Sequence, residues 1–137
     1  MLTLTEYVGP HFDSDDWTPK RQENAEMLME ACAMLQTTMV AAGVRFPTNP
    51  ATGSGISGQT FGGFRPQSCP QGAPDSAHKE GLAVDRYDPH GEIDAWLMKH
   101  EDVLAEHGIY IEHPDKTIHW SHWSIKPPRS GRHIFWP

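Results

Sequence analysis

The chain is poor in cysteine and in positive charge. Its 137 residues include two cysteines, Cys32 and Cys69, which lack CxxC spacing and are too few for a disulfide framework. We expect Cys32 to be a buried, inert thiol on a helix and Cys69 to be a free thiol. Lys and Arg number 11 against 18 Asp and Glu, so the formal net charge is −7. Because nucleic acids and anionic lipids repel such a chain, we expect neither a nucleic-acid partner nor a membrane partner.

Targeting signals are also missing from the sequence. The opening residues, MLTLTE, have no basic start followed by an apolar run, and no segment approaches the length that a membrane span needs. We therefore expect synthesis in the cytoplasm without a signal peptide.

Glycine and proline are abundant by comparison. Twelve residues of each type predict a chain with many turns and loops. The length suits one domain over residues 1–137, and the mixture of helical and alternating patterns favours the α+β class. We expect this domain to act as a monomer.

The clearest element is a helix over 19–42, with Thr18 as its N-cap and Gly43 as its C-terminal stop. Apolar residues recur along it in steps of three and four, which predicts one buried stripe. The remaining chain predicts strands at 60–65, 82–87, 109–112 and 117–125 and a helix at 92–107. A turn at 113–115 would join the last two strands in a hairpin.

One short segment combines residues that suit metal chemistry. His78 and Asp85 lie seven positions apart, with Gly81 between them to let the chain turn back. Imidazole nitrogen and carboxylate oxygen are normal zinc ligands. Asp85 directly follows the apolar run 82–84, where a lone buried charge would be costly. An isolated pair of this kind is more often a loop histidine and a locally paired carboxylate, but here the full pattern is Ser76-x-His-x-x-Gly-x-Ala-x-Asp.

This pattern resembles the signature of a zinc peptidase family. The family includes D-alanyl-D-alanine carboxypeptidases, the dipeptidases of vancomycin resistance, L-alanyl-D-glutamate endolysins and hedgehog signalling domains. In that family a third ligand follows a Trp-x pair, which here is Trp120-Ser121-His122. An upstream Gly-aromatic-Arg motif matches the segment 62–65, Gly-Gly-Phe-Arg. The resemblance covers most of the chain and is strongest to short phage and prophage members.

The resemblance implies a small antiparallel sheet with helices on one side and one Zn²⁺ held by His78, Asp85 and His122. His122 taken alone would more often be a hydrogen-bonded core residue. Three protein ligands with one open position are typical of a catalytic zinc, which activates a water molecule to cleave a peptide bond. By the same resemblance, Arg65 would hold a substrate carboxylate or stabilise the oxyanion. Ser76 and Trp123 are further candidates for contact with the substrate.

The general base is not fixed by the sequence. Several members of the family place a Glu three residues before the last ligand, where this chain has His119. Residues three apart on a strand point to opposite faces, so His119 would need a bulge to reach the metal. Glu112 is the favoured alternative, and whether it faces His122 depends on the hairpin register. His113, in the turn, is a third candidate.

The function expected from these residues is zinc-dependent hydrolysis of bacterial peptidoglycan stem peptides. The enzyme would be a D-Ala-D-Ala carboxypeptidase or an endolysin-like L-Ala-D-Glu endopeptidase. One alternative is a catalytically inactive, zinc-stabilised binding or structural module of a phage particle. Another is a cytoplasmic dipeptidase that acts on free D-Ala-D-Ala. A peptidoglycan enzyme made in the cytoplasm would reach the cell wall after phage-mediated release or as part of a virion.

Overall fold

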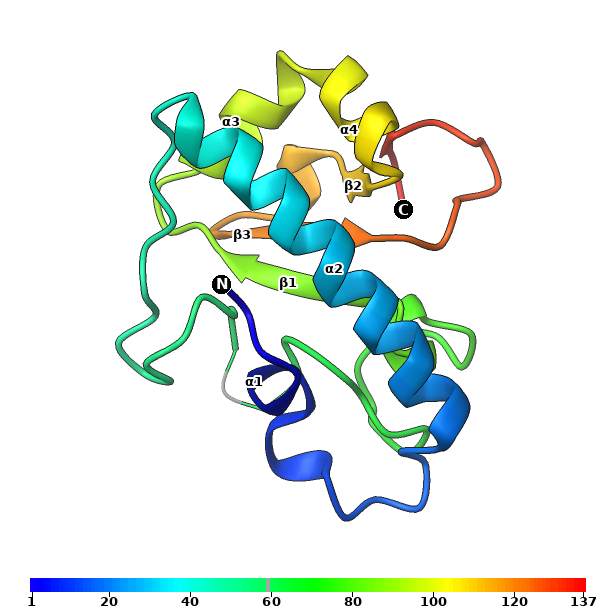
Figure 1. Ribbon diagram of the computed structural model, residues 1–137. Coiled ribbons are helices and arrows are strands. Elements are labelled where there is room, and N and C mark those ends of the chain that lie inside the picture. The colour runs from blue at the N-terminus through cyan, green and yellow to red at the C-terminus, as the bar shows by residue number, and fades with distance from the viewer. Residues whose placement is uncertain (59) are drawn as a thin grey trace.

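The computed structural model describes residues 1–58 and 60–137, and it shows an α+β fold (Figure 1). A four-stranded sheet, ordered β1-β3-β2-β4, is combined with four α-helices and three short 3₁₀ helices. The strands are β1 (Ala83–Tyr87), β2 (Tyr110–Glu112), β3 (Trp120–Ser124) and β4 (Ile134–Phe135). The α-helices are α1 (Leu4–Val8), α2 (Pro19–Ala41), α3 (Glu92–Met98) and α4 (Glu101–His107), and the 3₁₀ helices are η1 (Gly9–His11), η2 (Ala77–Glu80) and η3 (Pro114–Lys116).

The long helix α2 forms as the sequence predicts. The Thr18 side chain accepts a hydrogen bond from the Arg21 amide at its start, and the helix ends two residues before Gly43. Its buried stripe lies against the sheet, which the helix crosses in Figure 1. The buried residues of this stripe are Ala25, Leu28, Cys32, Leu35 and Met39. Within the described part of the chain, no helix has the length and apolar character required to traverse a bilayer.

Strand pairing divides the sheet into a core face and an open face. Asp85 on β1 lies opposite His122 on β3, and Val84 lies opposite Trp123. Because side chains alternate along a strand, Val84 and Trp123 point to one face and the two polar residues point to the other. Val84, Trp123 and Ile111 belong to the cluster that packs against α2, so the face with Asp85 and His122 is turned away from that core.

The last strand departs from a purely antiparallel sheet. β1 and β2 both run antiparallel to β3, as a hairpin prediction requires, but β4 pairs with β2 in parallel. After β3 the chain passes through residues 125–133, reverses, and joins the far side of β2. The expectation of an all-antiparallel sheet is therefore wrong at this edge.

The strand expected at 60–65 does not form. Its backbone instead makes isolated contacts, in which the Asp85 amide donates to the Gly62 carbonyl at 2.7 Å and the Phe64 amide donates to the Tyr7 carbonyl at 3.0 Å. A side chain at Gly62 would collide with the carbonyl oxygen of Ser57, so the chain approaches its neighbours too closely for a regular strand there. Just before this segment, the Ser57 amide donates to the Asp85 carbonyl at 2.8 Å. The loop thus covers the outer edge of β1.

The helix expected at 92–107 is broken at His100. Its backbone leaves the helical region, with φ −135° and ψ 47°, and separates α3 from α4. The His100 ring stacks on Trp96 at 3.8 Å and its Nδ1 lies 2.7 Å from the Trp96 carbonyl. A side chain that occupies this carbonyl competes with the hydrogen bond that would continue the helix.

Candidate metal centre

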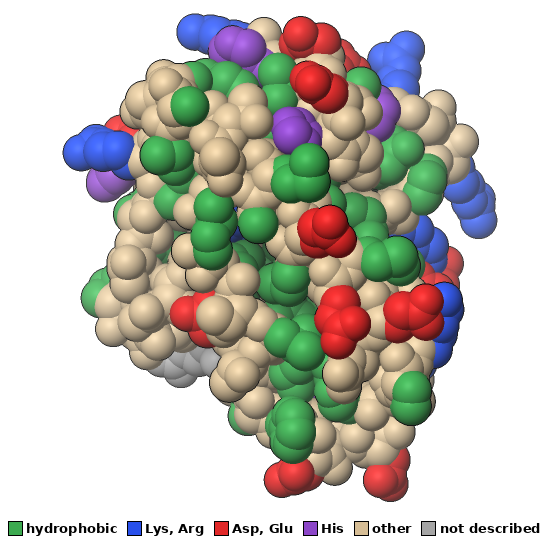
Figure 2. Space-filling view, in the orientation of Figure 1, with side chains coloured by type: hydrophobic (Ala, Val, Ile, Leu, Met, Phe, Trp, Pro, Cys, Tyr) green, Lys and Arg blue, Asp and Glu red, His purple; other side chains and the backbone are tan. Residues whose placement is uncertain are grey.

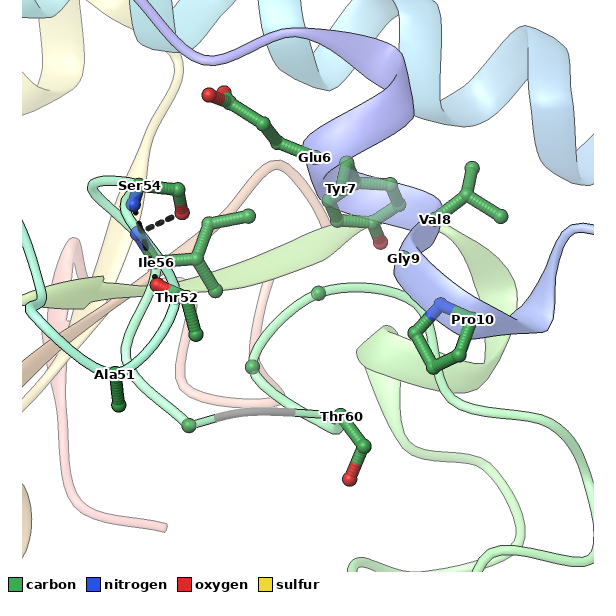
Figure 3. Close-up of a pocket in the computed structure, with 13 residues that line it drawn as sticks. Glu6, Tyr7, Val8, Gly9, Pro10, Ala51, Thr52, Ser54, Ile56 and Thr60 are labelled. Carbon is green, nitrogen blue, oxygen red and sulfur yellow. Dashed lines mark hydrogen bonds between the residues drawn. The ribbon is translucent and has the colours of Figure 1, made fainter.

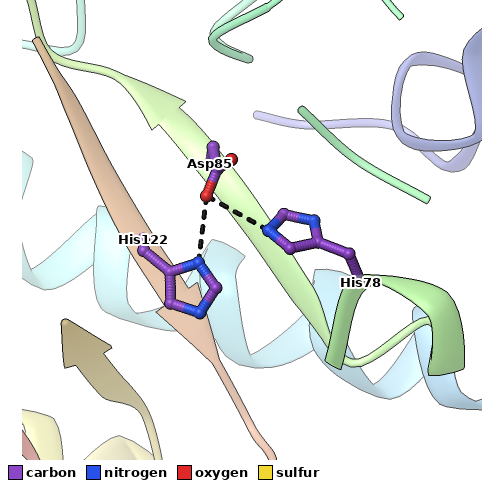
Figure 4. A group of neighbouring side chains, drawn as sticks. All are labelled: His78, Asp85 and His122. Atoms are coloured by element: carbon purple, nitrogen blue, oxygen red, sulfur yellow. Dashed lines mark hydrogen bonds and ion pairs between the residues drawn. The ribbon is translucent and has the colours of Figure 1, made fainter. Parts of the chain in front are cut away.

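Three side chains from three elements meet on the open face of the sheet (Figure 4). His78 comes from η2, Asp85 from β1 and His122 from the facing position of β3. Asp85 Oδ1 lies 3.2 Å from His78 Nε2 and 3.0 Å from His122 Nδ1. All three residues are buried, and one ligand atom from each lies within 4.8 Å of the others. The group His78–Asp85–His122 could therefore hold a metal ion.

Gly81 brings the first ligand back over the strand. It ends η2 with φ 77° and ψ 21°, a left-handed conformation that glycine adopts without strain. A Cβ at this position would lie 2.6 Å from the carbonyl oxygen of Arg21 on α2. The turn predicted between His78 and Asp85 is therefore confirmed, and both its conformation and its packing require glycine.

The hydrogen bonding of His78 favours a cation in the centre. Its Nδ1 lies 2.8 Å from the carbonyl oxygen of Gly63, which can only accept, so Nδ1 carries the proton. In the neutral ring Nε2 then presents a lone pair to the Asp85 carboxylate, and two electron-rich atoms at 3.2 Å need a proton or a metal ion between them. A tetrahedral zinc with bonds of about 2.0 Å separates its ligand atoms by roughly 3.3 Å. The observed separations of 3.0 and 3.2 Å are close to that spacing.

The electrostatics of the group keep Asp85 ionised. Burial by itself raises the pKa of this carboxyl, but the charge of His78 and the hydrogen bonds from both histidines outweigh burial and hold the pKa far below its usual range. For His122, burial lowers the pKa, while the hydrogen bond and charge of Asp85 and the charge of Glu112 raise it above its ordinary value. A carboxylate that remains charged inside a buried site is a suitable ligand for a cation.

Arg65, which was expected to contact the substrate, lies beside the metal group. In the structure it contacts Asp85. Its Nη2 donates to Asp85 Oδ2 at 3.2 Å, and its Nε donates to the Phe61 carbonyl at 2.7 Å. The two side chains are 13% and 12% exposed, so the ion pair is largely removed from solvent. Arg65 therefore holds the outer oxygen of the carboxylate and leaves Oδ1 directed at the two histidines.

Glu112 lies on the same face as the ligands. The pairing of β2 with β3 places Tyr110 opposite Ser124 and Ile111 opposite Trp123, and the next pair in this register is Glu112 with His122. The carboxylate oxygen Oε1 lies 4.0 Å from His122 Nε2, and the side chain is 24% exposed. Of the candidates for general base, Glu112 is thus beside the metal group and within reach of solvent.

The other candidates occupy different places. His119 is exposed in the turn before β3 with φ 77°, and its Nδ1 lies 3.1 Å from the Pro89 carbonyl, so its ring is not brought to the metal group. The ring of His113 stacks on Trp136 with the centroids 4.0 Å apart. Ser76 is half-buried immediately before η2, two positions from His78.

Trp123 requires a correction. It is fully buried on the core face of the sheet, where its ring packs against the Arg86 guanidinium and its Nε1 donates to Ser121 at 2.9 Å. It neighbours His122 in sequence, but consecutive residues of a strand point to opposite faces. Trp123 therefore cannot line a substrate cleft around the metal group.

Two contributors to the site were not expected from the sequence. The Gly63 carbonyl orients His78, and no side-chain pattern reports the direction of a backbone carbonyl. Phe135 on β4 lies opposite Glu112, and its ring centroid is 6.4 Å from that of His122. The apolar ending Ile134-Phe135 was the available signal for this strand, but two residues are too short for a period to be recognised.

A separate cavity of about 310 Å³ lies beside α1 (Figure 3). It is bordered by α1 and by the loop around Ser54, Ile56 and Gly62–Gly63. None of the three ligands lines it, although the Gly63 carbonyl that orients His78 belongs to its wall segment. The cavity is therefore distinct from the metal group.

Comparisons of the chain with models of known protein families, with curated proteins and with solved structures found no match.

Proposed function

We propose that this protein is a zinc-dependent peptidase that hydrolyses peptide bonds in bacterial peptidoglycan stem peptides. The observation that supports it most is the buried His78–Asp85–His122 group, in which one ligand atom from each residue lies within 4.8 Å of the others. The position of Glu112 on the same open face supports hydrolysis over a purely structural metal. The choice of zinc rests on the His and carboxylate donor set, and that of the substrate on the resemblance of the sequence motifs.

Zinc held by these three ligands would supply a Lewis acid that lowers the pKa of a bound water towards about 7 and polarises the scissile carbonyl. Glu112 would be the general base that takes a proton from the attacking water and would return it to the leaving amine. Its side chain is partly exposed, whereas Asp85 is buried and would serve as a metal ligand. Arg65 orients Asp85 by fixing its outer oxygen, and the backbone of Gly63 orients His78 in the same manner.

Metal content is the first test of this proposal. The wild-type protein and His122→Ala are purified without chelator and analysed for bound metals. We expect about one zinc per chain in the wild type and almost none in the variant, because two remaining ligands do not hold zinc tightly. A wild-type protein that stays free of zinc after reconstitution would contradict the proposed zinc site and with it the proposed function.

Turnover is tested separately with two synthetic stem peptides, one with a terminal D-Ala-D-Ala bond and one with an L-Ala-D-Glu bond. Glu112→Gln should retain zinc and lose most of the rate, while Glu106→Gln, an exposed acid on α4, serves as the matched control. If zinc is bound but neither peptide is cleaved, the inactive module of a phage particle replaces the enzyme. Cleavage of free D-Ala-D-Ala alone would select a cytoplasmic dipeptidase.

A further inference from the structure

An apolar groove with an acidic border lies between α2 and α4, on the side of the molecule opposite to the metal group. It has a volume of about 290 Å³. Its lining residues are Met27, Glu30, Ala31, Met34, Glu106 and His107. Met27 and Met34 are 47% and 56% exposed, so the apolar part of the groove is open to solvent. We propose that this groove is a docking site for a positively charged, amphipathic helical segment of a partner protein.

The spacing of the exposed residues suits a helix-binding groove. Met27, Ala31 and Met34 follow each other at intervals of four and three on α2, so they form a second stripe beside the one that packs on the sheet. A pair of flexible thioether side chains adapts to apolar groups of different shape, which is why methionine is frequent on surfaces that bind helices. A contact between Thr38 Oγ1 and His107 Nε2 at 3.3 Å joins the two helices at one end of the groove.

The charge around the groove determines the occupant. Glu30 and Glu106 line it, and neither forms a salt bridge with any residue in 1–58 or 60–137. The first turn of α2 carries Lys20 and Arg21, but the rest of that helix and the whole of α4 contain no Lys or Arg. Figure 2 shows hydrophobic and acidic side chains together over α2, while Lys and Arg lie mainly at the margins of the view. A partner that places Lys or Arg beside its apolar residues would complement both features.

The same charge disfavours the two other occupants of an apolar groove. A second copy of this chain would bring its own acidic α2 and a net charge of −7 against the same surface. An anionic lipid surface would be repelled in the same way. A bound basic helix, in contrast, would leave the metal group on the opposite face of the sheet accessible to a substrate.

The test uses a synthetic amphipathic peptide of about 18 residues, long enough for a marginal helix, with Leu on one face and Lys on its flanks. Its binding to the zinc-loaded full-length protein is measured by fluorescence anisotropy, beside a peptide in which Glu replaces every Lys. We expect saturable binding of the Lys peptide, weakened at least about tenfold in Met34→Glu, as for a central interface residue. Met98→Glu, an exposed methionine on α3, is the matched control and should bind as the wild type does.

A second variant, Glu30→Lys/Glu106→Lys, keeps the apolar lining and should weaken binding of the Lys peptide while it strengthens binding of the Glu peptide. Equal affinity of the Lys peptide for wild type and for both groove variants would overturn the proposal, because the peptide would then bind elsewhere on the surface. Self-association in sedimentation experiments that Met34→Glu abolishes would assign the groove to a second copy and equally overturn it. Zinc content and thermal melting confirm in each case that the variant is folded.

Discussion

Asp94 gives the most direct quantitative test of the fold, because its carboxyl group is buried in the folded protein. It lies on α3 with 3% of its surface exposed. The Thr117 hydroxyl donates to Oδ2 at 2.9 Å, whereas Oδ1 has no partner among the described residues. Burial raises the pKa of this carboxyl to about 6, the neighbouring charge of Asp88 adds to the rise, and hydrogen bonds from Ser121 and Thr117 offset only part of it.

The sign of the effect follows from the direction of that shift. The pKa is about 6 in the folded protein and 3.8 as the ordinary value, so the folded state binds the proton more tightly than the unfolded state. Stability from this group is fully present below pH 4 and is lost as the pH rises through 6. A difference of about two units corresponds to about 3 kcal/mol in the free energy of unfolding. Asp94→Asn keeps the shape and cannot ionise, so it should not show this loss.

The assay is urea denaturation of wild type and Asp94→Asn from pH 4 to pH 8, with chelator present so that metal binding does not contribute. The free energy of unfolding of the variant minus that of the wild type should rise with pH by about 2–3 kcal/mol, most of it between pH 4 and 7. Asp102→Asn, an exposed acid on α4, should show no such rise. A difference that stays flat with pH, or that falls, would refute the reasoning.

Three further substitutions test the metal centre and its surroundings. Gly63→Ala should weaken zinc binding about 10–100-fold and lower the free energy of unfolding by about 1–3 kcal/mol, because a Cβ there collides with the Tyr7 carbonyl and displaces the carbonyl that orients His78. Gly55→Ala, with its nearest neighbours at 3.4 Å, is the control, and equal zinc affinity in the two variants would be inconsistent with the orienting role. Arg65→Lys keeps the positive charge but cannot reach both Asp85 and the Phe61 carbonyl, so a chelator competition should show zinc binding about tenfold weaker. His119→Asn suits the left-handed backbone at φ 77° and should preserve peptide hydrolysis, whereas a loss of rate with zinc retained would identify His119 as the base.

Much of the fold follows from patterns that one segment contains by itself. The helix α2 was predictable because its cap, its apolar stripe and its terminal glycine are all local. β1 and the hairpin of β2 and β3 were predictable for the same reason. The break at His100 was not, because an apolar period continues through 92–107 and does not report a ring that takes the Trp96 carbonyl. β4 was also missed, since its two residues are ordered by pairing with β2 and not by their own pattern.

The candidate site shows the same division between local and distant information. The turn from His78 to Asp85 was predictable from Gly81, and the motif resemblance added His122, which the structure brings to the same place. The side on which Glu112 lies depends on register, because a shift by one residue would turn it to the core. The partner of Arg65 depends on a contact between distant segments, for which the sequence contains no signal. The direction of Trp123 did have a signal, because alternation along the predicted strand turns it away from His122.

The loop that covers the outer edge of β1 also limits how a peptide can be recognised. Extended peptides often bind by adding a strand to an unpaired sheet edge, where backbone groups recognise the ligand whatever its side chains are. On β1 the amide and the carbonyl of Asp85 are already bonded to Gly62 and Ser57, and the Tyr87 amide is bonded to Gly55. The opposite edge, β4, is only two residues long. A ligand of the open face must therefore be selected by its side chains and its termini. The covered edge of β1 and the short edge of β4 also protect the sheet from pairing with another chain during aggregation.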